Sequence, residues 1–279
     1  MLALAPAAGG NPERGHAMFS HDLLPKAVRS VVETERCTGC GFCVHLDDRI
    51  RMHEKDGFLR PTMSDPAADV RDTRTAARLF RRVCPGVSVS ASAPEGAKRH
   101  RTLGPLRTLA IGWATDPDVR FAGSSGGVLS ALLGWLVESR QVTTATASQP
   151  DPVNPRRTIP LSVVNRQDVL RSAGSRYEPA TVGPAAPVDD PGAVVVCKPC
   201  EAQALRSYST SVGSQAPLIL SFFCAGTPSH QATDSLLAKL GVQSHEQLDS
   251  LRYRGNGWPG HFTAKTRSGR VVAETYEKS

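Results

Sequence analysis

Four cysteines have the spacing of ligands to an iron–sulfur cluster. Cys37, Cys40 and Cys43 follow one another at intervals of three residues, and the distant Cys84 precedes a proline. Thiolates hold the irons of such clusters, and a remote cysteine next to proline commonly supplies a ligand. In the bacterial two-cluster pattern a cysteine comes four residues after the third, where this chain has Asp47. We therefore expect one [4Fe–4S] cluster, held by Cys37, Cys40, Cys43 and Cys84.

Two simpler explanations of these cysteines compete with the cluster. Zinc is bound by thiolates as well, but its sites usually pair cysteines two by two rather than placing three in a row. Cys84 could instead be a buried structural cysteine, since free cysteine is among the most buried residue types. Of the eight histidines only His45 lies beside the cluster loop, and none shows the spacing of a ligand pair.

A glycine-rich stretch offers chemistry of a second kind. Ser124, Ser125, Gly126 and Gly127 follow Gly123, between an expected strand and an expected helix. Glycines permit close approach of the backbone, and free amides at the start of a helix favour an anion such as a pyrophosphate. The alternative is an ordinary glycine-rich helix start.

The remaining cysteines follow two expected strands. Cys197-Lys198-Pro199-Cys200 comes after a buried strand and opens a helix, and Cys224 ends the next strand. Ligands of α/β sheets bind at the carboxyl ends of strands, so we expect these cysteines to face one crevice. The spacing fits a redox dithiol, because a helix N-terminus lowers the pKa of the first thiol. A partial metal site and small buried residues are the alternatives.

Composition limits the class of protein. The 279 residues are 40% hydrophobic and 21% charged, and no apolar run reaches the length of a membrane span. Cysteines with cluster spacing indicate a reducing compartment, so we expect a cytoplasmic protein without structural disulfides. The net charge of +7 comes largely from residues 71–82 and 98–107. With only 5% aromatic residues, and Phe80 alone among these basic stretches, we expect an anionic cofactor or acidic redox protein and not nucleic acid.

Apolar periodicity predicts the elements that position these residues. Helices are expected at residues 22–33, 76–83, 124–140, 167–172, 201–208 and 229–241, and after a capping box formed by Ser244 and Gln247. Strands are expected at residues 57–61, 106–114, 142–147, 159–164, 193–197, 218–223, 261–266 and 270–276. The order predicts an α/β fold, a mixed sheet flanked by helices, with an N-terminal cluster-binding segment. We divide the chain into a disordered tail (1–21), the cluster segment with a linker within 86–104 (22–100) and an α/β domain (101–279).

Several motifs in this order resemble one protein family. They are the Cys37–Cys43 run, Ser-Ser-Gly-Gly-Val-Leu-Ser-Ala-Leu-Leu from Ser124, Gly-Ser-Arg-Tyr ending at Tyr177, Lys-Pro-Cys-Glu-Ala-Gln from Lys198, Phe-Phe-Cys-Ala-Gly-Thr-Pro-Ser ending at Ser229, and Arg-Tyr-Arg-Gly-Asn-Gly-Trp-Pro-Gly ending at Gly260. Together they resemble the coenzyme F420 hydrogenase/dehydrogenase beta-subunit family, over roughly residues 37–276.

The resemblance implies an oxidoreductase that carries FAD and iron–sulfur clusters and exchanges electrons with coenzyme F420. It assigns to the flavin the residues Ser124, Ser125, Gly126, Gly127, Ser175, Arg176, Tyr177 and Pro199, and places Lys198 and Cys200 as catalytic residues beside the reacting ring. It implies a redox partner protein or hydrogenase/dehydrogenase subunits. Cys197 departs from the family, where a glycine-like residue is expected.

The alternatives are a non-catalytic electron-transfer subunit, a reductase of a hydroxymethyl-chlorophyll-type pigment and a thiol oxidoreductase using Cys197 and Cys200. The family also usually continues into a segment with further cluster ligands, so we expect the chain to be C-terminally truncated, or else a smaller variant with one cluster.

Overall fold

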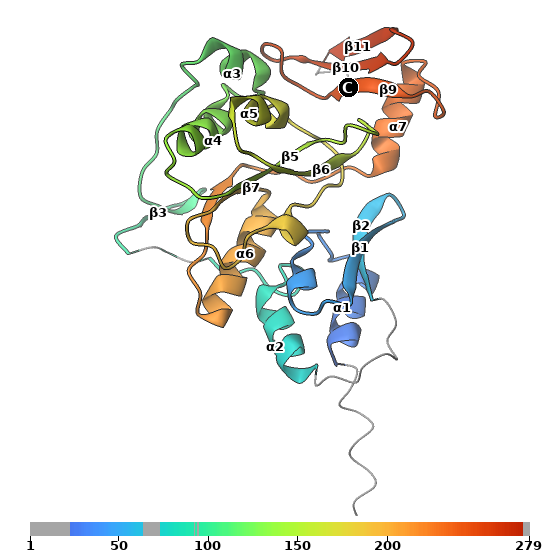
Figure 1. The fold of residues 1–279 in the computed structure, drawn as a ribbon. Coiled ribbons are helices and arrows are strands. Elements are labelled where there is room, and N and C mark those ends of the chain that lie inside the picture. Colours follow the sequence, from blue (N-terminus) through green and yellow to red (C-terminus); the bar gives the residue numbers. More distant parts are fainter. Residues whose placement is uncertain (1–22, 64–72, 92, 94, 276–279) are drawn as a thin grey trace, which may run out of the picture.

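A four-stranded mixed sheet is the centre of the molecule (Figure 1). The computed structural model describes residues 23–63, 73–91, 93 and 95–275; the tail predicted for residues 1–21 lies outside them. The strand order is β6-β5-β7-β8, where β5, β7 and β8 are parallel and β6 is antiparallel to β5. The strands are β5 (Ala145–Pro150), β6 (Thr158–Ser162), β7 (Val194–Cys197) and β8 (Leu218–Ser221). The predicted mixed α/β fold is confirmed.

Helices cover both faces of this sheet (Figure 1). On one face, α4 (Val128–Glu138) and α5 (Arg166–Ser172) pack on β5, β6 and β7 through Leu133, Leu136 and Val169. Asn165 caps α5 as predicted, because its side chain accepts a 3.0 Å hydrogen bond from the amide of Asp168. On the other face, α6 (Pro199–Val212) packs on β7. The strand β7 begins with three valines because helices cover both of its faces, so side chains on both faces are apolar.

The N-terminal segment has a core of its own and lies against α6. Its elements are α1 (Leu23–Glu33), the short 3₁₀ helix η1 (Phe42–His45), the hairpin β1 (Ile50–Lys55) and β2 (Phe58–Met63), and α2 (Arg74–Val83). Apolar side chains of α1, α2 and β1 form one cluster around Leu24, Ile50 and Phe80. Phe42 and Val83 instead join the core beneath α6. The cysteine loop is therefore continuous with the core of the α/β part.

A third layer closes the C-terminal side. It contains α7 (His230–Lys239) and a small antiparallel sheet of β9 (Leu248–Arg252), β10 (His261–Thr266) and β11 (Val271–Thr275). The predicted terminal hairpin is confirmed within the described residues. The other elements are β3 (Lys98–His100), β4 (Gly104–Leu106), α3 (Pro117–Ala122) and η2 (Gly183–Ala185). None of the helices in the described ranges has the length and apolar character that crossing a membrane requires.

Two predicted elements are wrong. The strand expected at 106–114 is a loop beyond Leu106, and Leu109, Ile111 and Trp113 are exposed there. Its alternating pattern suits a strand, but neither edge strand of the main sheet pairs with it. The helix expected after Ser244 is β9, because Leu248 and Leu251 pack in the core of the third layer, where β10 provides a pairing edge. Tertiary packing here overrides the local capping signal.

The linker and the glycine-rich loop also differ from expectation. Part of the linker predicted within 86–104 forms the short hairpin of β3 and β4. The glycine-rich loop follows the helix α3 and not a strand. Asp116 caps α3 by accepting hydrogen bonds from the amides of Asp118 and Val119. An acidic cap followed by proline at the first helical position is a helix signal that periodicity alone does not reveal.

The buried face of α4 can be tested with neighbouring leucines. Leu133 is 1% exposed, whereas its neighbour Leu132 in the same helix is 43% exposed. Leu133→Ala should lower the free energy of unfolding by about 2–5 kcal/mol, because it leaves a cavity between α4 and the sheet. Leu132→Ala should cost less than about 0.5 kcal/mol. Chemical denaturation of both variants measures this difference, and equal losses would contradict the packing described.

Candidate iron–sulfur and flavin sites

The cysteine loop bends through two glycines in left-handed conformation. Gly39 and Gly41 have φ of 69° and 77°, which side chains rarely adopt. A Cβ at Gly41 would lie 2.6 Å from Oγ1 of Thr181. These two glycines therefore allow a tight turn, and Gly41 lets the loop pack closely against the α/β part.

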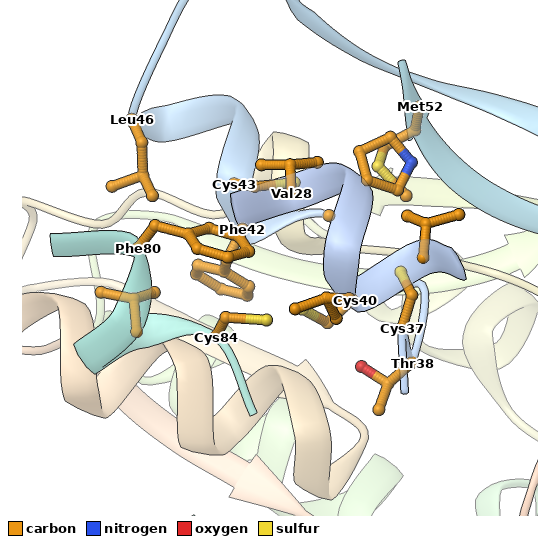
Figure 2. Close-up of a pocket in the computed structure, with 15 residues that line it drawn as sticks. Val28, Cys37, Thr38, Cys40, Phe42, Cys43, Leu46, Met52, Phe80 and Cys84 are labelled. Atoms are coloured by element: carbon orange, nitrogen blue, oxygen red, sulfur yellow. The ribbon is translucent and has the colours of Figure 1, made fainter. Parts of the chain in front are cut away.

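The four predicted ligands surround one cavity (Figure 2). Cys37, Cys40 and Cys43 come from the loop, and Cys84 from the residue that ends α2. The cavity is small, with a volume of about 30 Å³. Its other walls are mostly apolar, including Phe42 and Phe80. Among the described residues, no three cysteine, histidine or acidic side chains lie in an arrangement that would hold a single metal ion.

Burial disfavours the ionised form of three of these thiols when no cation is bound. It raises the pKa of Cys40 well above the usual range, raises the pKa of Cys43 to about 12 and raises the pKa of Cys84. The neighbouring cysteines raise the pKa of each thiol further, since thiolates this close repel one another. Iron bound between them would remove both penalties, because coordination deprotonates a thiol outright.

One segment, residues 174–183, runs from the glycine-rich loop to the cysteine loop, and we call it the strap. At its far end the hydroxyl of Thr181 donates a 2.7 Å hydrogen bond to the carbonyl of Cys40. Gly183 packs so closely that a Cβ there would lie 2.1 Å from the same carbonyl oxygen. His45 contacts the carbonyl of Gly183 through Nε2 at 2.8 Å. The strap therefore holds the cysteine loop at Cys40 and at His45.

The start of α6 completes this contact. Glu201 is 2% exposed and accepts hydrogen bonds from the amides of Lys198 (2.8 Å) and Val182 (3.0 Å). The ammonium of Lys198 donates to the carbonyl of Ala180 and lies 3.9 Å from Glu201. Burial raises the pKa of Glu201. Sequence reasoning gave Glu201 no role, although a glutamate at the third position of a helix is a known capping signal.

Cys200 lies beside the cysteine loop. Its thiol is close to the hydroxyl of Thr38 and to the thiol of Cys40. The structure thus brings Cys200 to the predicted cluster site, whereas Lys198 and Pro199 precede it at the start of α6. They adjoin the part of the strap that contacts this site, not the glycine-rich loop.

The prediction of a lowered thiol pKa at Cys197 is wrong. Cys197 is 2% exposed, and burial raises its pKa strongly, with Glu201 raising it further. Burial raises the pKa of Cys200 as well. Cys224 does not share this environment: it is exposed, and its thiol donates a weak 3.7 Å hydrogen bond to the carbonyl of Gly226. A buried dithiol of this kind lacks the thiolate that exchange chemistry needs.

The glycine-rich loop meets the near end of the strap. The amide of Ser175 donates a 2.6 Å hydrogen bond to the hydroxyl of Ser124, and Arg254 donates to the carbonyl of Ser124 at 3.2 Å. Gly127 has φ of 71°, and a Cβ there would lie 2.7 Å from the carbonyl of Val119. The glycine is therefore required by the turn itself. Ser125 stays exposed at the start of α4.

Two residues assigned to the flavin have structural partners. Arg176, a residue of the strap, is largely buried; it donates to the carbonyls of Leu251, Pro155 and Arg157 and lies over the ring of Tyr253. Tyr177 packs edge to face on Tyr253 at 5.8 Å. Exposed aromatic rings that sequence reasoning did not select, Trp113, Phe121 and Trp258, belong to segments that contact or adjoin the glycine-rich loop.

Comparison with known proteins decides the family. The models of the N-terminal and C-terminal parts of the coenzyme F420 hydrogenase/dehydrogenase beta subunit match residues 109–185 and 192–278. The chain belongs to this family. Both matched ranges lie in the α/β and C-terminal layers. The cysteine loop precedes them.

A solved structure is also similar to the chain. It belongs to the F420-reducing [NiFe] hydrogenase complex from Methanosarcina barkeri, studied by xenon derivatization, and is 18% identical with a TM-score of 0.45. The match covers 60% of this chain and 59% of that one, so the chain spans less than two thirds of its length. No curated protein matches the chain.

The cysteine assignment predicts a sharp difference between two substitutions. Cys40→Ser should abolish the broad iron–sulfur absorbance and remove most of the iron, because a hydroxyl is a poor replacement for a buried thiolate ligand. Cys224→Ser, at the exposed cysteine, should retain the iron content of the parent. Iron and sulfide analysis of anaerobically purified protein measures both. Full iron retention in the Cys40 variant would refute the assignment.

Proposed function

We propose that this family member is an iron–sulfur flavoprotein that passes electrons between a [4Fe–4S] cluster and coenzyme F420 through FAD. Cys37, Cys40, Cys43 and Cys84 would hold the cluster. Ser124, Ser125, Gly126 and Gly127 with Ser175 would bind the flavin, and Lys198 and Cys200 would lie between the two. The observation that carries the proposal is the convergence of all four cysteines on one apolar cavity.

The donor set supports a cluster over zinc. Four thiols around a hydrophobic cavity suit a cube of iron and sulfide, because its irons take thiolate ligands. Asp47, the residue at the position of the two-cluster ligand, forms an ion pair with Arg49 at 2.7 Å. Its carboxylate is therefore engaged by its own neighbour, which leaves Cys84 as the fourth ligand.

Three features support a flavin at the near end of the strap. The first turn of α4 presents backbone amides, which favour the pyrophosphate of FAD. Ser125 adds an exposed hydroxyl, and Arg254 brings a cation to the carbonyl of Ser124. The exposed rings of Trp113 and Trp258 offer apolar surface for an aromatic cofactor.

The chemistry requires an intermediary between the two carriers. A cluster carries single electrons and a deazaflavin accepts hydride; a flavin can do both and supplies this conversion when bound. The residues of the chain position it: the strap fixes the distance between the two loops, and Glu201 orients the strap. Lys198 adds positive charge where negative charge would develop.

The second candidate is a relay subunit that docks on a hydrogenase or dehydrogenase without reducing a small molecule itself. The exposed apolar residues of loop 107–113 favour a protein partner, since Leu109, Ile111 and Trp113 have no cover among the described residues. Tightly bound flavin distinguishes the two candidate functions. A yellow purified protein favours the enzyme, and a brown protein without flavin favours the relay subunit. A hydroxymethyl-chlorophyll-type pigment remains the alternative substrate.

The flavin loop can be tested without disturbing the turn. Ser125→Glu puts a negative charge at the start of α4, where it is compatible with the helix but repels a pyrophosphate. FAD affinity should fall about tenfold or more, about 1.4 kcal/mol per factor of ten. Gln141→Glu, an exposed change of equal charge after the end of α4, should leave affinity unchanged. Equal affinity of all three proteins in calorimetric titration with FAD would show that this loop is only a helix start.

Turnover tests the proposal as a whole. The reconstituted chain, supplied anaerobically with a low-potential chemical reductant, should bleach the absorbance of coenzyme F420, and the Cys40→Ser variant should not. Bleaching by the parent with cluster and flavin bound supports the enzyme. Tight binding of both cofactors with no reduction of F420 would contradict the substrate assignment.

A further inference from the structure

A buried ionisable network lies on the strap between the two proposed cofactor loops. Glu178 follows Tyr177, and its side chain is completely buried. Neither of its carboxylate oxygens has a hydrogen-bond partner among the described residues, although the hydroxyl of Thr158 faces it. A buried carboxylate without full compensation is costly, so its presence calls for an explanation.

His230 connects this carboxyl group with the surface. It is the first residue of α7, and its side chain is 4% exposed. Nε2 lies 3.2 Å from the carbonyl of Pro179 and 3.5 Å from Glu178. Nδ1 lies 2.8 Å from Oε2 of Glu54, whose side chain is 47% exposed on strand β1. The three groups therefore form a continuous line from solvent to the interior.

The tautomer of His230 follows from its partners. A carbonyl oxygen only accepts hydrogen bonds, so the contact with Pro179 assigns the proton to Nε2. Nδ1 then carries a lone pair towards Glu54, and this atom meets no hydrogen-bond geometry in the described structure. The resting arrangement is thus ready to receive a proton from the solvent side.

We propose that Glu54, His230 and Glu178 form a proton-transfer route from solvent to the buried strap, which serves flavin reduction and so rests on the proposed function. Reduction of FAD takes two electrons and two protons, and a cluster delivers electrons alone. A proton passes from Glu54 to Nδ1 of His230, and the Nε2 proton passes to Glu178. The ring is then neutral again and carries its remaining proton on Nδ1.

The surrounding charges are compatible with transient protonation of Glu178. Arg176 lies 3.7 Å from this carboxyl group, and Arg157 lies 3.9 Å from Glu54 and 3.6 Å from Asp234. The phenol of Tyr253, the residue after β9, also faces the group, and burial raises its pKa to about 12. Burial raises the pKa of Glu178 even though Arg176, His230 and Arg157 oppose this. A purely structural ion pair would favour the ionised form instead.

Infrared spectroscopy tests the route without reference to turnover. In the holoprotein, the spectrum of the parent minus that of Glu178→Gln should contain the carboxylic-acid band of Glu178, which shifts when the sample is transferred to D2O. His230→Gln and Glu54→Gln should each slow this exchange by about tenfold or more. Asp234→Asn is the matched control, because Asp234 lies on the same helix and pairs with Arg156 and Arg157 outside the route. Its exchange should equal that of the parent.

Flavin reduction provides the second readout. The rate of flavin reduction by a chemical reductant should be about tenfold or more lower in His230→Gln than in the parent. In His230→Ala, added imidazole should restore the rate. Absence of the Glu178 band, or unchanged exchange in both route variants, would overturn the proposal even if FAD and cluster are bound. Band and exchange as expected in a protein that binds no FAD would instead refute the proposed function and leave a proton route to another acceptor.

Discussion

The buried carboxylate of Glu201 is the interaction on which the rest of the site depends. It accepts hydrogen bonds from the backbone amides of Lys198, at the start of α6, and of Val182, in the strap. Two backbone donors satisfy a carboxylate that would otherwise be costly inside the protein. This arrangement fixes the strap against the sheet, and the strap in turn holds the carbonyl of Cys40 through Thr181. The position of the cysteine loop is thus set by the α/β part of the chain.

This constraint explains how two separately folded parts make one site. The N-terminal segment has its own core around Leu24 and Phe80, yet Phe42 and Val83 pack into the core beneath α6. The strap then continues to Ser175 at the glycine-rich loop. A single stretch of ten residues therefore touches both proposed cofactor loops and carries Glu178 between them. Electron and proton transfer would share this one piece of backbone.

The sequence predicted the elements with strong patterns and missed those that depend on partners. The cysteine spacing led to four side chains that do line one cavity, and the apolar run of β7 led to a buried central strand. The segment 106–114 has a strand-like pattern but no pairing edge, and the residues after Ser244 have a helix cap but pair with β10. Pairing is a long-range property that local residues do not encode.

The site shows the same division. Ser124 and Ser175 were both assigned to the flavin, and the structure joins them. Arg176 was assigned there too, but its guanidinium is occupied by backbone carbonyls under the strap. The thiol chemistry expected of Cys197 fails because the spacing of two cysteines does not reveal how deeply they are buried. Glu178 and His230 escaped notice because 52 positions separate them in sequence and only the fold brings them together.

In the proposed function, one chain holds a cluster and a flavin at the two ends of the strap. The most direct measurement is a joint count of iron, acid-labile sulfide and flavin in the anaerobically reconstituted protein, together with the EPR spectrum of its reduced state. We expect about four irons, about four sulfides and about one FAD per chain, with the EPR signal of a reduced [4Fe–4S] cluster. Stoichiometric zinc in place of iron, or a cluster with no bound flavin, would contradict it.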